Sequence, residues 1–554
     1  MKQNISGVWT IAAFLAALSL TATASAQKRG GVLKTYDPDS PGGMSIMEEA
    51  TVFARGPMNG VFNNLIMFDQ HVPQNSLQSI VPDLATDWSW NEEGTALTFQ
   101  LRHGVKFHDG KPFTARDVKC TFDLRMDLAP EKLRINPGKS SLYNLAEVTI
   151  NGDWEATFHL KRPQPAFPML IASDSFGIYP CHVSPAQMRQ HPIGTGPFKF
   201  IEYKQNEYIK VARNSDYWKP DRPYLDGIEY TIIKDPSTAT LAFTAGKFDI
   251  TFPYAALTIP QMKDIASQTP QAICELHRGG GGTNRHILVN YHKPPFDNPA
   301  IRRAMALSLD RQAFIDTISQ GQGEIGGVLQ PPPEGLWGLS RDQIATLPGY
   351  GLDVAKNREE GRRIMEKAGY GPDYRLAIKV SARNLQGFRD PGVLLIDQIK
   401  HVYIDGELEL VDTPQYYPKI LRKDFTVGLN IQTSGPDPDP ILNNFYGCGA
   451  SINWDGYCNP EVDQLIDRQS REGDPARRKE VLWQIERKLA EDVARPIIFY
   501  SSGATCRQPY VKGLTFMVEQ PLQWLAYGRR LARQIGRHNL RNIDPIVVRT
   551  PGCA

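Results

Sequence analysis

The sequence predicts an α/β protein with mixed sheets, divided into at least two lobes that each have a hydrophobic core. Two observations lead to this prediction. The chain has 554 residues, whereas a single hydrophobic core stops growing at roughly 250–300 residues. Strand-like and helix-like segments also alternate along the chain without an internal repeat, which is typical of α/β proteins.

The segments after residue 96 support this fold class one by one. Alternation of apolar and polar residues predicts strands, and a polar cap before a helical apolar pattern predicts helices. The predicted elements, in order, are a strand from Leu97 through Val105 and Phe107, a helix from Ala115 capped by Thr114, a strand from Phe198 after a tight turn at 194–197, a strand from Ile228 to Ile233, a helix from Ser237 to Ala245, a helix starting at Asn298-Pro299 and a helix from Asp353 to Ala368. Gly246 and Gly369 follow two of these helices, as expected of helix ends.

The N-terminal segment predicts export from the cytoplasm. Lys2 gives a positively charged start, Val8 to Leu20 is almost continuously apolar, and Ala24-Ser25-Ala26 is a small-residue cleavage site. This pattern is typical of a secretory signal peptide over residues 1–26, cut after Ala26. The apolar run is shorter than the roughly 20 residues of a membrane span, and no cysteine lies near the cleavage site. We therefore expect a periplasmic protein that is not a lipoprotein.

Composition argues against two classes of protein. Charged residues make up 22% of the chain and the formal net charge is +2. A disordered protein would have a larger net charge and fewer apolar residues, and a nucleic-acid-binding domain would be strongly basic. We expect a folded protein with no nucleic-acid partner.

The cysteines are the residues that an exported protein can join in disulfides. The seven are Cys120, Cys181, Cys274, Cys448, Cys458, Cys506 and Cys553, and no two have the C-x-x-C spacing of zinc or redox sites. Cys448 and Cys458 flank a segment rich in glycine, serine and asparagine, so we predict a disulfide between them. Cys120 and Cys274 lie in apolar segments and are expected to be buried and unpaired. The odd number leaves at least one thiol free or intermolecular.

Eight motifs in a fixed order resemble the family 5 extracellular solute-binding proteins, the peptide-, dipeptide- and nickel-binding group of ABC importers. They are PDLA with Trp88 and LTFQLRHGVKFHDGKPFTARDV (82–118), GTGPF (194–198), ARNSDYW (212–218), AFTAGKFDI (242–250), PFDNPAIRRAMALSLDR (295–311), DVAKNREEGRRIMEKAGY (353–370), CNPEVDQLI (458–466) and ARPIIFY (494–500). The resemblance spans roughly residues 30 to 530. The basic C-terminal tail lies outside it.

The resemblance implies a two-lobed periplasmic-binding-protein fold of the large class II type, with two strands crossing between the lobes. The implied first lobe covers residues 27–285 with an extra subdomain at about 70–205. The second lobe covers 286–505, and residues 506–554 return to the first lobe and form the tail. The implied function is capture of a peptide or peptide-like solute in the cleft, hinge closure around it, and delivery to the permease subunits of an ABC importer. A monomer is expected.

The resemblance also indicates where the ligand is held. In peptide-binding members an aspartate shortly before a D-P-D-like segment meets the ligand's amine, and here that position falls on Ser434. Asp437 and Asp439 lie close by and are candidate ligand contacts in its place. Because Ser434 is not acidic, longer or capped peptides, opine-like conjugates, oligosaccharides and nickel chelates stay open as ligands. The sequence does not settle ligand identity or length.

Four further residues are predicted to face the cleft. Arg383 and Arg389 lie in the loop where the resemblance places side chains that face the cleft. They are candidate partners for a ligand carboxylate, because a guanidinium pairs with a carboxylate through two hydrogen bonds, with a solvated surface position as the alternative for each. Tyr446 and Trp454 are candidate wall or stacking residues, with a core position as the alternative for Trp454. Trp337, after a run of three prolines, is a weaker candidate of the same kind.

An enzyme and a metal site are the competing classes. The sequence has neither the G-x-S-x-G elbow of hydrolases nor the H-E-x-x-H motif of metalloproteases. The 11 histidines are scattered without a local cluster of ligands. We expect a binding protein without catalytic residues, without a cofactor and without a directly bound metal.

Overall fold

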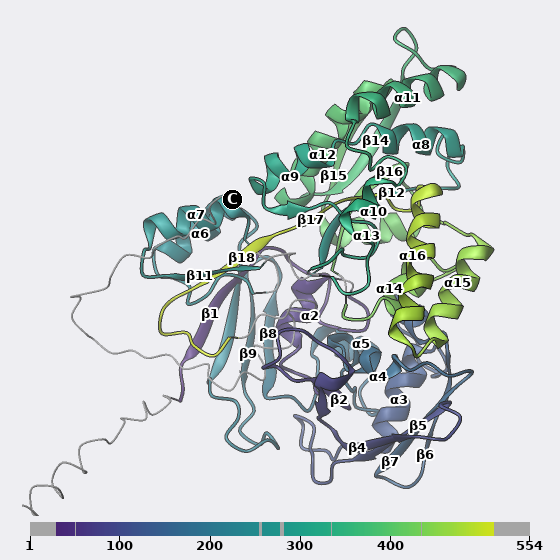
Figure 1. Ribbon diagram of the computed structural model, residues 1–554. Helices are drawn as coiled ribbons and strands as arrows, with labels where there is room; N and C mark the ends of the chain where they lie inside the picture. The colour runs from purple at the N-terminus through teal and green to yellow at the C-terminus, as the bar shows by residue number, and fades with distance from the viewer. Residues whose placement is uncertain are drawn as a thin grey trace, which may run out of the picture.

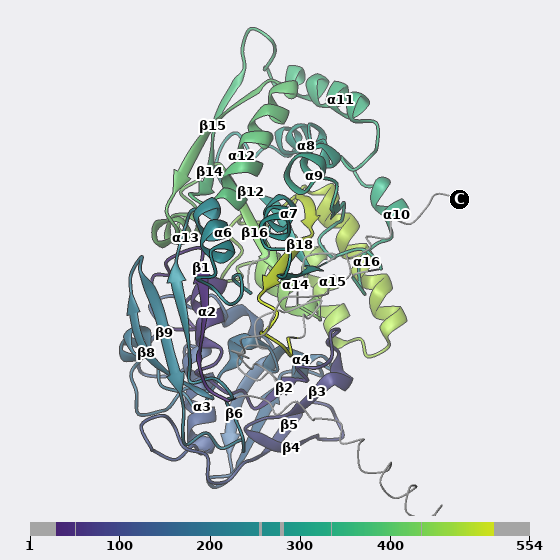
Figure 2. The same cartoon turned by 90° about the vertical axis from the view of Figure 1, so that its left-hand side faces the viewer.

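The computed structural model describes residues 29–49, 51–253, 257–277, 282–333, 335–433 and 435–514. The predicted signal peptide, Ser434, the basic tail and Cys553 lie outside these residues. The described chain folds into two lobes that contain several mixed or antiparallel sheets (Figures 1 and 2).

The first lobe is built on a four-stranded sheet with the order β1-β10-β9-β8. Its strands are β1 (Val32–Asp37), β8 (Phe198–Lys204), β9 (Tyr208–Arg213) and β10 (Gly227–Ile232), with helices α2 (Val52–Met58), α5 (Pro185–Gln190), α6 (Pro236–Thr244) and α7 (Ile259–Gln268). β1 runs parallel to β10 and the other neighbours are antiparallel. Buried apolar residues of these strands and helices form one core with residues near the end of the described chain, such as Cys506 and Val511.

A subdomain within this lobe has its own antiparallel sheet and its own core. The sheet has the order β4-β5-β7-β6, and its strands are β4 (Ala85–Trp90), β5 (Ala96–Leu101), β6 (Leu145–Ile150) and β7 (Glu155–Leu160). Helix α3 (Ala115–Arg125) packs on it through Phe122, which meets Phe158 edge to face. The pair β2 (Ile66–Phe68) and β3 (Ile80–Pro82), helix α4 (Phe167–Ile171) and the short helical turns η1 (Leu77–Ser79), η2 (Lys139–Leu142) and η3 (Asp174–Phe176) complete it.

The second lobe is built on a six-stranded sheet with the order β13-β17-β12-β16-β14-β15. Its strands are β12 (Thr283–Val289), β13 (Gly323–Glu324), β14 (Leu376–Arg383), β15 (Ile404–Val411), β16 (Val427–Thr433) and β17 (Ile497–Ser501). β14 is parallel to both β15 and β16, whereas β12 is antiparallel to β16 and β17, so the sheet is mixed. In both views this sheet lies at the end of the molecule opposite to the subdomain.

Helices surround the second sheet and extend from it toward the subdomain. They are α8 (Pro299–Leu307), α9 (Arg311–Ser319), α10 (Arg341–Ala345), α11 (Val354–Lys367), α12 (Gln386–Ile399), η5 (Lys400–Val402), α13 (Thr413–Leu421), α14 (Asp439–Phe445), α15 (Pro460–Arg471) and α16 (Pro475–Glu491). The last three form a separate apolar core with Val328 and Leu329. In Figure 1 they run beside the subdomain helices.

The chain passes between the lobes at two places. Strand β11 (Ile273–His277) precedes β12 of the second lobe, and strand β18 (Gly503–Arg507) follows β17 of the same lobe. β11 and β18 pair with each other in an antiparallel two-stranded sheet. The two crossings therefore leave the second lobe side by side, as the expected pair of connecting strands requires. The residue limits of the lobes and subdomain stay predictions.

Most predicted elements are confirmed near their expected ends. Thr114, Asn298 and Asp353 are the capping residues of α3, α8 and α11. Two details were wrong. β5 ends at Leu101 instead of continuing to Phe107, because the chain turns at Gly104, which has a φ of +76°. α6 begins at Pro236 because Asp235 accepts a hydrogen bond from the Thr238 amide and caps the helix.

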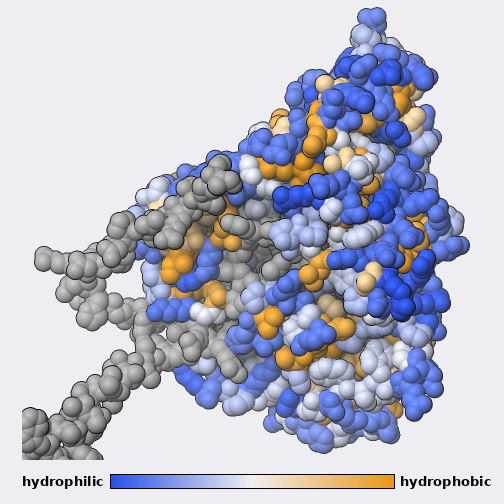
Figure 3. Space-filling view, viewed as in Figure 1, coloured by the Kyte–Doolittle hydropathy of each residue, from blue (hydrophilic) through white to orange (hydrophobic). Residues whose placement is uncertain are grey.

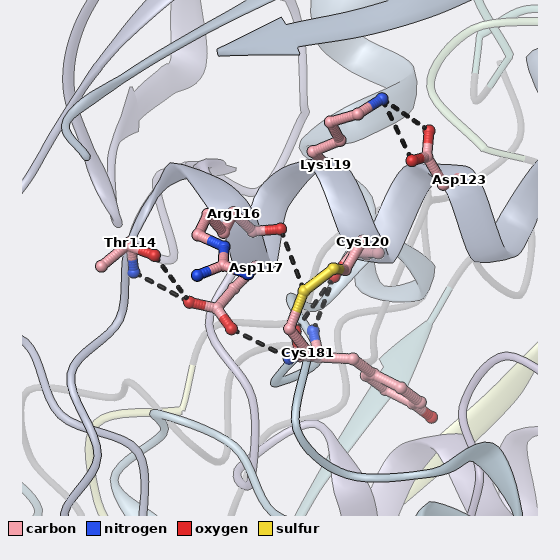
Figure 4. Close-up of a disulfide and its surroundings, with 9 residues drawn as sticks. Thr114, Arg116, Asp117, Lys119, Cys120, Asp123 and Cys181 are labelled. Carbon is pink, nitrogen blue, oxygen red and sulfur yellow. Dashed lines mark hydrogen bonds and ion pairs between the residues drawn. A yellow bond between two sulfur atoms is a disulfide. The ribbon is translucent and has the colours of Figure 1, made fainter. Parts of the chain in front are cut away.

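Three disulfides join six of the seven cysteines. The predicted bond between Cys448 and Cys458 is confirmed. The prediction that Cys120 and Cys274 are unpaired was wrong, because Cys120 bonds to Cys181 and Cys274 bonds to Cys506. Figure 4 shows Cys120 on α3 beside the loop that holds Cys181, whose amide donates to Asp117 (2.9 Å). The partners are 61 and 232 residues apart, so an apolar local sequence could not identify them.

The surface in Figure 3 is mainly hydrophilic, with hydrophobic residues in small separate groups on the face shown. Wide apolar patches mark interaction sites, and the visible described part of this face has none. No helix within the described ranges combines the length and the apolar character needed to cross a membrane.

Candidate functional site

A cavity of about 540 Å³ lies between the two lobes. The volume is in the range of small-molecule sites, roughly 300–1,000 Å³. The first lobe lines it with residues of β1, α2, α4 and α6, and the second lobe with residues of β12, α12, β16 and α14. A ligand in this cavity contacts both lobes, and such contact allows a ligand to favour a closed arrangement over an open one.

Beside the cavity the lobes touch directly through polar side chains, which we call the rim contacts. They join the subdomain to α14, α15 and the loop between them. The pairs are Ser140 with Ser451 (3.1 Å), Ser141 with Asn444 (2.6 Å), Tyr143 with Ser470 (2.5 Å), Arg162 with Asp467 and Gln164 with Asp439. These contacts exist only while the lobes meet, so the structure is a closed arrangement.

Asp437 and Asp439 have different surroundings although both are buried. Asp437 lines the cavity and forms two hydrogen bonds with Arg478, at 2.6 and 2.7 Å. Asp439 is not among the described lining residues. It accepts hydrogen bonds from Gln469 at 2.5 Å and Ser470 at 3.1 Å, and from Gln164 across the lobes. Burial and the neighbouring Asp437 raise the pKa of Asp439. Asp439 therefore belongs to the rim contacts.

The two predicted arginines also separate. Arg383 lines the cavity but is already paired: its guanidinium lies 2.7 Å from Asp39 of the first lobe and donates to Thr413. Arg389 is about half exposed on α12, next to Asp390 at 3.7 Å, and is not among the described lining residues. Arg383 thus connects the lobes, and Arg389 lies outside the described lining of the cavity.

Of the predicted aromatic residues, Trp454 lines the cavity and Tyr446 does not. Trp454 is 6% exposed, and its ring lies 5.6 Å from that of Tyr417, another lining residue. Tyr446 is buried in the core formed by α14, α15 and α16. Trp337 donates a hydrogen bond to the Pro436 carbonyl at 3.2 Å and stacks on Arg478. It therefore supports the cavity loop from behind.

The sequence analysis missed a group of lining residues with buried polar atoms that have no hydrogen-bond partner. Unpaired buried polar atoms are rare in folded proteins and cost roughly 1–3 kcal/mol each. In this cavity they are Arg55 Nε, Arg125 Nε, Asp174 Oδ2, Arg285 Nη1, Asn430 Oδ1 and Asn444 Oδ1. They come from six separate elements, so no local motif could reveal them. Together they offer both donors and acceptors to a ligand.

Burial also changes the acid–base properties of the lining groups. It raises the pKa of Glu49 to about 7, with a further contribution from the neighbouring Glu48. It lowers the pKa of Arg125 and of Arg285 to about 10, so both stay charged at neutral pH. No group of three or more histidine, cysteine or acidic residues within the described ranges could hold a metal ion. Arg125 and Arg285 therefore place positive charge in the described cavity wall, and the described residues offer no metal site.

Comparison with known proteins agrees with the family resemblance of the sequence motifs. The family described as bacterial extracellular solute-binding proteins, family 5 Middle, matches residues 79–453. Di/tripeptide-binding protein 1 of Pseudomonas aeruginosa is 27% identical over 472 residues, which cover 80% of this chain and 83% of that protein.

Solved structures that share the fold include two with a bound ligand. The periplasmic binding protein DppA of Helicobacter pylori in complex with the peptide STSA has a TM-score of 0.81 at 20% identity, covering 92% of this chain and 99% of that one. The binding protein AgaA of A. tumefaciens R10 in complex with agropinic acid has a TM-score of 0.76 at 21% identity, with the same coverage. These likenesses confirm the two-lobed fold, mixed sheets included.

Proposed function

Because the chain belongs to the bacterial extracellular solute-binding proteins of family 5, we propose that it captures peptides or peptide-like solutes in the interlobe cavity and delivers them to an ABC importer. The single observation that carries the proposal is the set of unpaired polar atoms in the cavity wall. A peptide bond offers one donor and one acceptor per residue. The unpaired arginine nitrogens and asparagine oxygens are complementary to such a ligand.

Closure gives the protein a way to signal that it is occupied. A ligand shifts the equilibrium between open and closed lobes only by its difference in affinity for the two forms. Lining residues from both lobes surround the cavity, so the full set of contacts forms only in the closed form. The permease subunits would then recognise the closed protein. This role needs no catalytic residue, so we propose a binding protein and not an enzyme.

The place of action follows from the N-terminal sequence and the family. We propose that the signal peptide of residues 1–26 directs export and is cleaved after Ala26, and that the mature protein works as a periplasmic monomer without a lipid anchor. The disulfides are consistent with this compartment, because disulfides persist where the surroundings are oxidising.

Relatives favour two ligand classes. The names of the Pseudomonas and Helicobacter proteins refer to peptides, whereas the Agrobacterium structure holds agropinic acid. Peptides and agropinic acid both carry polar groups that can form hydrogen bonds with the unpaired polar atoms of the cavity wall. We propose that Asp437, Arg383 and Trp454 contact the ligand, because all three line the cavity. Glu49 is the one lining acid without an ion pair among the described residues, so it is the candidate contact for a ligand amine.

Mass spectrometry of ligand that co-purifies with the mature protein tests the function directly. A second experiment measures, by calorimetry, the binding of a peptide pool, a nickel–histidine mixture and cello-oligosaccharides. We expect heat from the peptide pool and a more compact scattering profile with it. The variant Asn430→Leu removes one unpaired acceptor and should weaken peptide binding about tenfold. Asn384→Leu is the matched control, because Asn384 is exposed and bonds Asp412 outside the cavity. Heat from the sugars alone would reject the peptide assignment.

A further inference from the structure

Four of the rim contacts join the lobes through residues that are not among the described lining residues of the cavity, and we call these four contacts the latch. They are the pairs Ser140 with Ser451, Tyr143 with Ser470, Arg162 with Asp467, and Gln164 with Asp439. The first-lobe partners lie on η2, just after it, and in the segment before α4, whereas the second-lobe partners lie on α14, α15 and the loop between them. A solute that fills the cavity therefore leaves the latch untouched.

The Asp439 carboxylate is the centre of the latch, and its two oxygens have different roles. The Oδ1 atom accepts a hydrogen bond from Gln469 of the same lobe at 2.5 Å. The Oδ2 atom accepts from Ser470 of the same lobe at 3.1 Å, and from Gln164 and Tyr143 (3.5 Å) of the first lobe. The second lobe thus holds the carboxylate in place, and only the Oδ2 atom gains and loses partners as the lobes meet and part.

Arg478 orients the side chain that fixes Asp439. Its Nε and Nη2 atoms donate to the side-chain oxygen of Gln469 at 3.0 and 2.9 Å, so the Gln469 amide nitrogen is turned toward Asp439. Asn443 gives the Oδ1 atom a second donor at 3.0 Å. Because all these groups belong to the second lobe, the carboxylate is positioned before the lobes meet. Closure therefore does not have to order it, which lowers the entropy cost of forming the latch.

Burial makes the partners of Asp439 in the first lobe necessary for closure. The side chain is only 2% exposed in this closed arrangement, and a buried carboxylate is costly unless hydrogen-bond donors satisfy it. Closing the lobes removes water from the Oδ2 atom, so the first lobe has to replace the water with donors of its own. The Gln164 amide and the Tyr143 hydroxyl are those donors. An acceptor in the place of Gln164 would oppose closure.

A contact of this kind affects every solute in the same way. When only the closed form binds a solute fully, the apparent affinity is reduced by the fraction of solute-free protein that is closed. A weaker latch lowers that fraction by one factor, whatever the chemistry of the solute. A change in a lining residue, in contrast, alters the contacts of different solutes by different amounts.

We propose that the latch keeps a measurable fraction of the solute-free protein closed and thereby sets the affinity for all solutes by a common factor, with Gln164 and Tyr143 as the donors to Asp439. The inference rests on the proposed function in one respect: the solute is bound between the lobes. Gln164, Tyr143 and Asp439 are positioning residues of the closed form and do not contact the solute.

Calorimetry with chemically different probes tests the common factor. The probes are the peptide STSA, trialanine and agropinic acid. Tyr143→Phe removes only the hydroxyl that bonds Ser470 and Asp439. We expect every probe that binds to lose about five- to tenfold in affinity, by the same factor. Tyr208→Phe is the matched control, because its hydroxyl donates to Glu202 at 2.8 Å on the exposed surface of the first lobe, and it should change no affinity. No loss in Tyr143→Phe, or losses that differ between probes, would overturn the proposal.

A reversal of donor and acceptor separates a latch from a merely structural role. Gln164→Glu keeps the shape of the side chain and the oxygen that accepts from Asn144 (3.0 Å), but it places a second carboxylate against Asp439. We expect the lobes to stay apart in scattering and every probe to bind at least about 30-fold more weakly. Adding Asp439→Asn supplies a donor to the new carboxylate and should restore most of the affinity. A double variant that binds more weakly than both single variants would show that Asp439 only supports the fold.

A measurement without solute separates the latch from the proposed function. Ser140→Cys with Ser451→Cys places two thiols where the hydroxyl oxygens lie 3.1 Å apart, in a chain that also carries Cys553→Ser. Mild oxidation should trap the closed form without solute, and Tyr143→Phe should slow the trapping about fivefold, whereas Tyr208→Phe should not. Trapping that requires a solute, or that ignores Tyr143→Phe, rejects the latch and leaves the capture function standing. If no probe binds but trapping occurs and slows as expected, the proposed ligands fall and the latch stands.

Discussion

Two buried arginine–aspartate pairs look alike but join different parts of the molecule. Arg495 and Asp455 lie 2.7 Å apart inside the second lobe, with side chains only 1% and 2% exposed. Arg383 and Asp39 are also 2.7 Å apart, with 4% and 3% exposure, but Asp39 belongs to the first lobe and Arg383 to the second. The first pair stays buried whether the lobes are open or closed, whereas opening exposes the second pair to water. Equal burial in one structure therefore does not imply an equal role.

The largest expected effect is on the pair within one lobe. Asp455→Asn leaves the Arg495 charge buried without a counterion, which costs about 3–5 kcal/mol. Asp455 also accepts a hydrogen bond from the Val289 amide at 2.7 Å, so the second sheet is affected as well. We expect urea unfolding of the second lobe at a clearly lower midpoint. A midpoint like that of the control Asp405→Asn, which changes an exposed pair with Arg375, would contradict this role.

The pair between the lobes should affect binding instead of folding. In Asp39→Asn the Arg383 charge is hydrated when the lobes open, so the unfolding midpoint without ligand should hardly change. Ligand affinity should fall by about 2 kcal/mol, or roughly 30-fold, because closure then buries a poorly paired charge. Calorimetry and scattering measure the effect; a large drop in the unfolding midpoint with unchanged affinity would reverse the assignment.

A smaller effect is expected from Glu49, which lines the cavity and contributes to its charge. Burial raises its pKa to about 7, so the side chain is largely neutral below that pH and negative above it. A carboxylate ligand without an amine, ionised over this range, should bind a few-fold more weakly as the pH rises from 6 to 8, whereas a peptide with a free amine should bind more tightly. Glu49→Gln should abolish the pH dependence in calorimetric titrations. If the peptide with a free amine also binds more weakly as the pH rises, Glu49 is rejected as the amine contact.

The smallest effect is expected for Arg389. Its side chain is 48% exposed and its only ion-pair partner in the described chain is the adjacent Asp390. Surface substitutions of this kind usually change stability by less than about 0.5 kcal/mol. Arg389→Gln should therefore leave both the unfolding midpoint and ligand affinity unchanged. A clear loss of affinity would restore Arg389 as a ligand contact, as the sequence predicted.

Local signals predicted the parts of the fold that local physics determines. Capping residues such as Thr114 and Asp353 identified where helices begin, because the cap and the helix are neighbours in sequence. The disulfide of Cys448 and Cys458 was predicted for the same reason, since its partners are 10 residues apart. Cys274 and Cys506 meet only because β11 and β18 pair. That pairing depends on the whole first lobe and has no local signature.

The candidate site was predicted only in part for a similar reason. The segment after β16 was expected to face the cavity, and Asp437 and Trp454 do line it. The sequence could not separate Asp437 from Asp439, because two residues along a chain that turns into a helix can face different neighbours. Nor could it reveal Arg285, whose importance lies in a missing partner. An unpaired atom is a property of the packed molecule, and no residue pattern encodes it.

The disulfide between β11 and β18 has a consequence for how the lobes can move. It fastens the two strands together immediately next to the points where the chain passes to the second lobe. The disulfide therefore holds the two connecting strands together beside the hinge. They must bend together when the lobes open or close, and they cannot slide past each other. In a reducing cytoplasm this disulfide would not persist, so β11 and β18 are covalently joined only after the protein reaches an oxidising compartment.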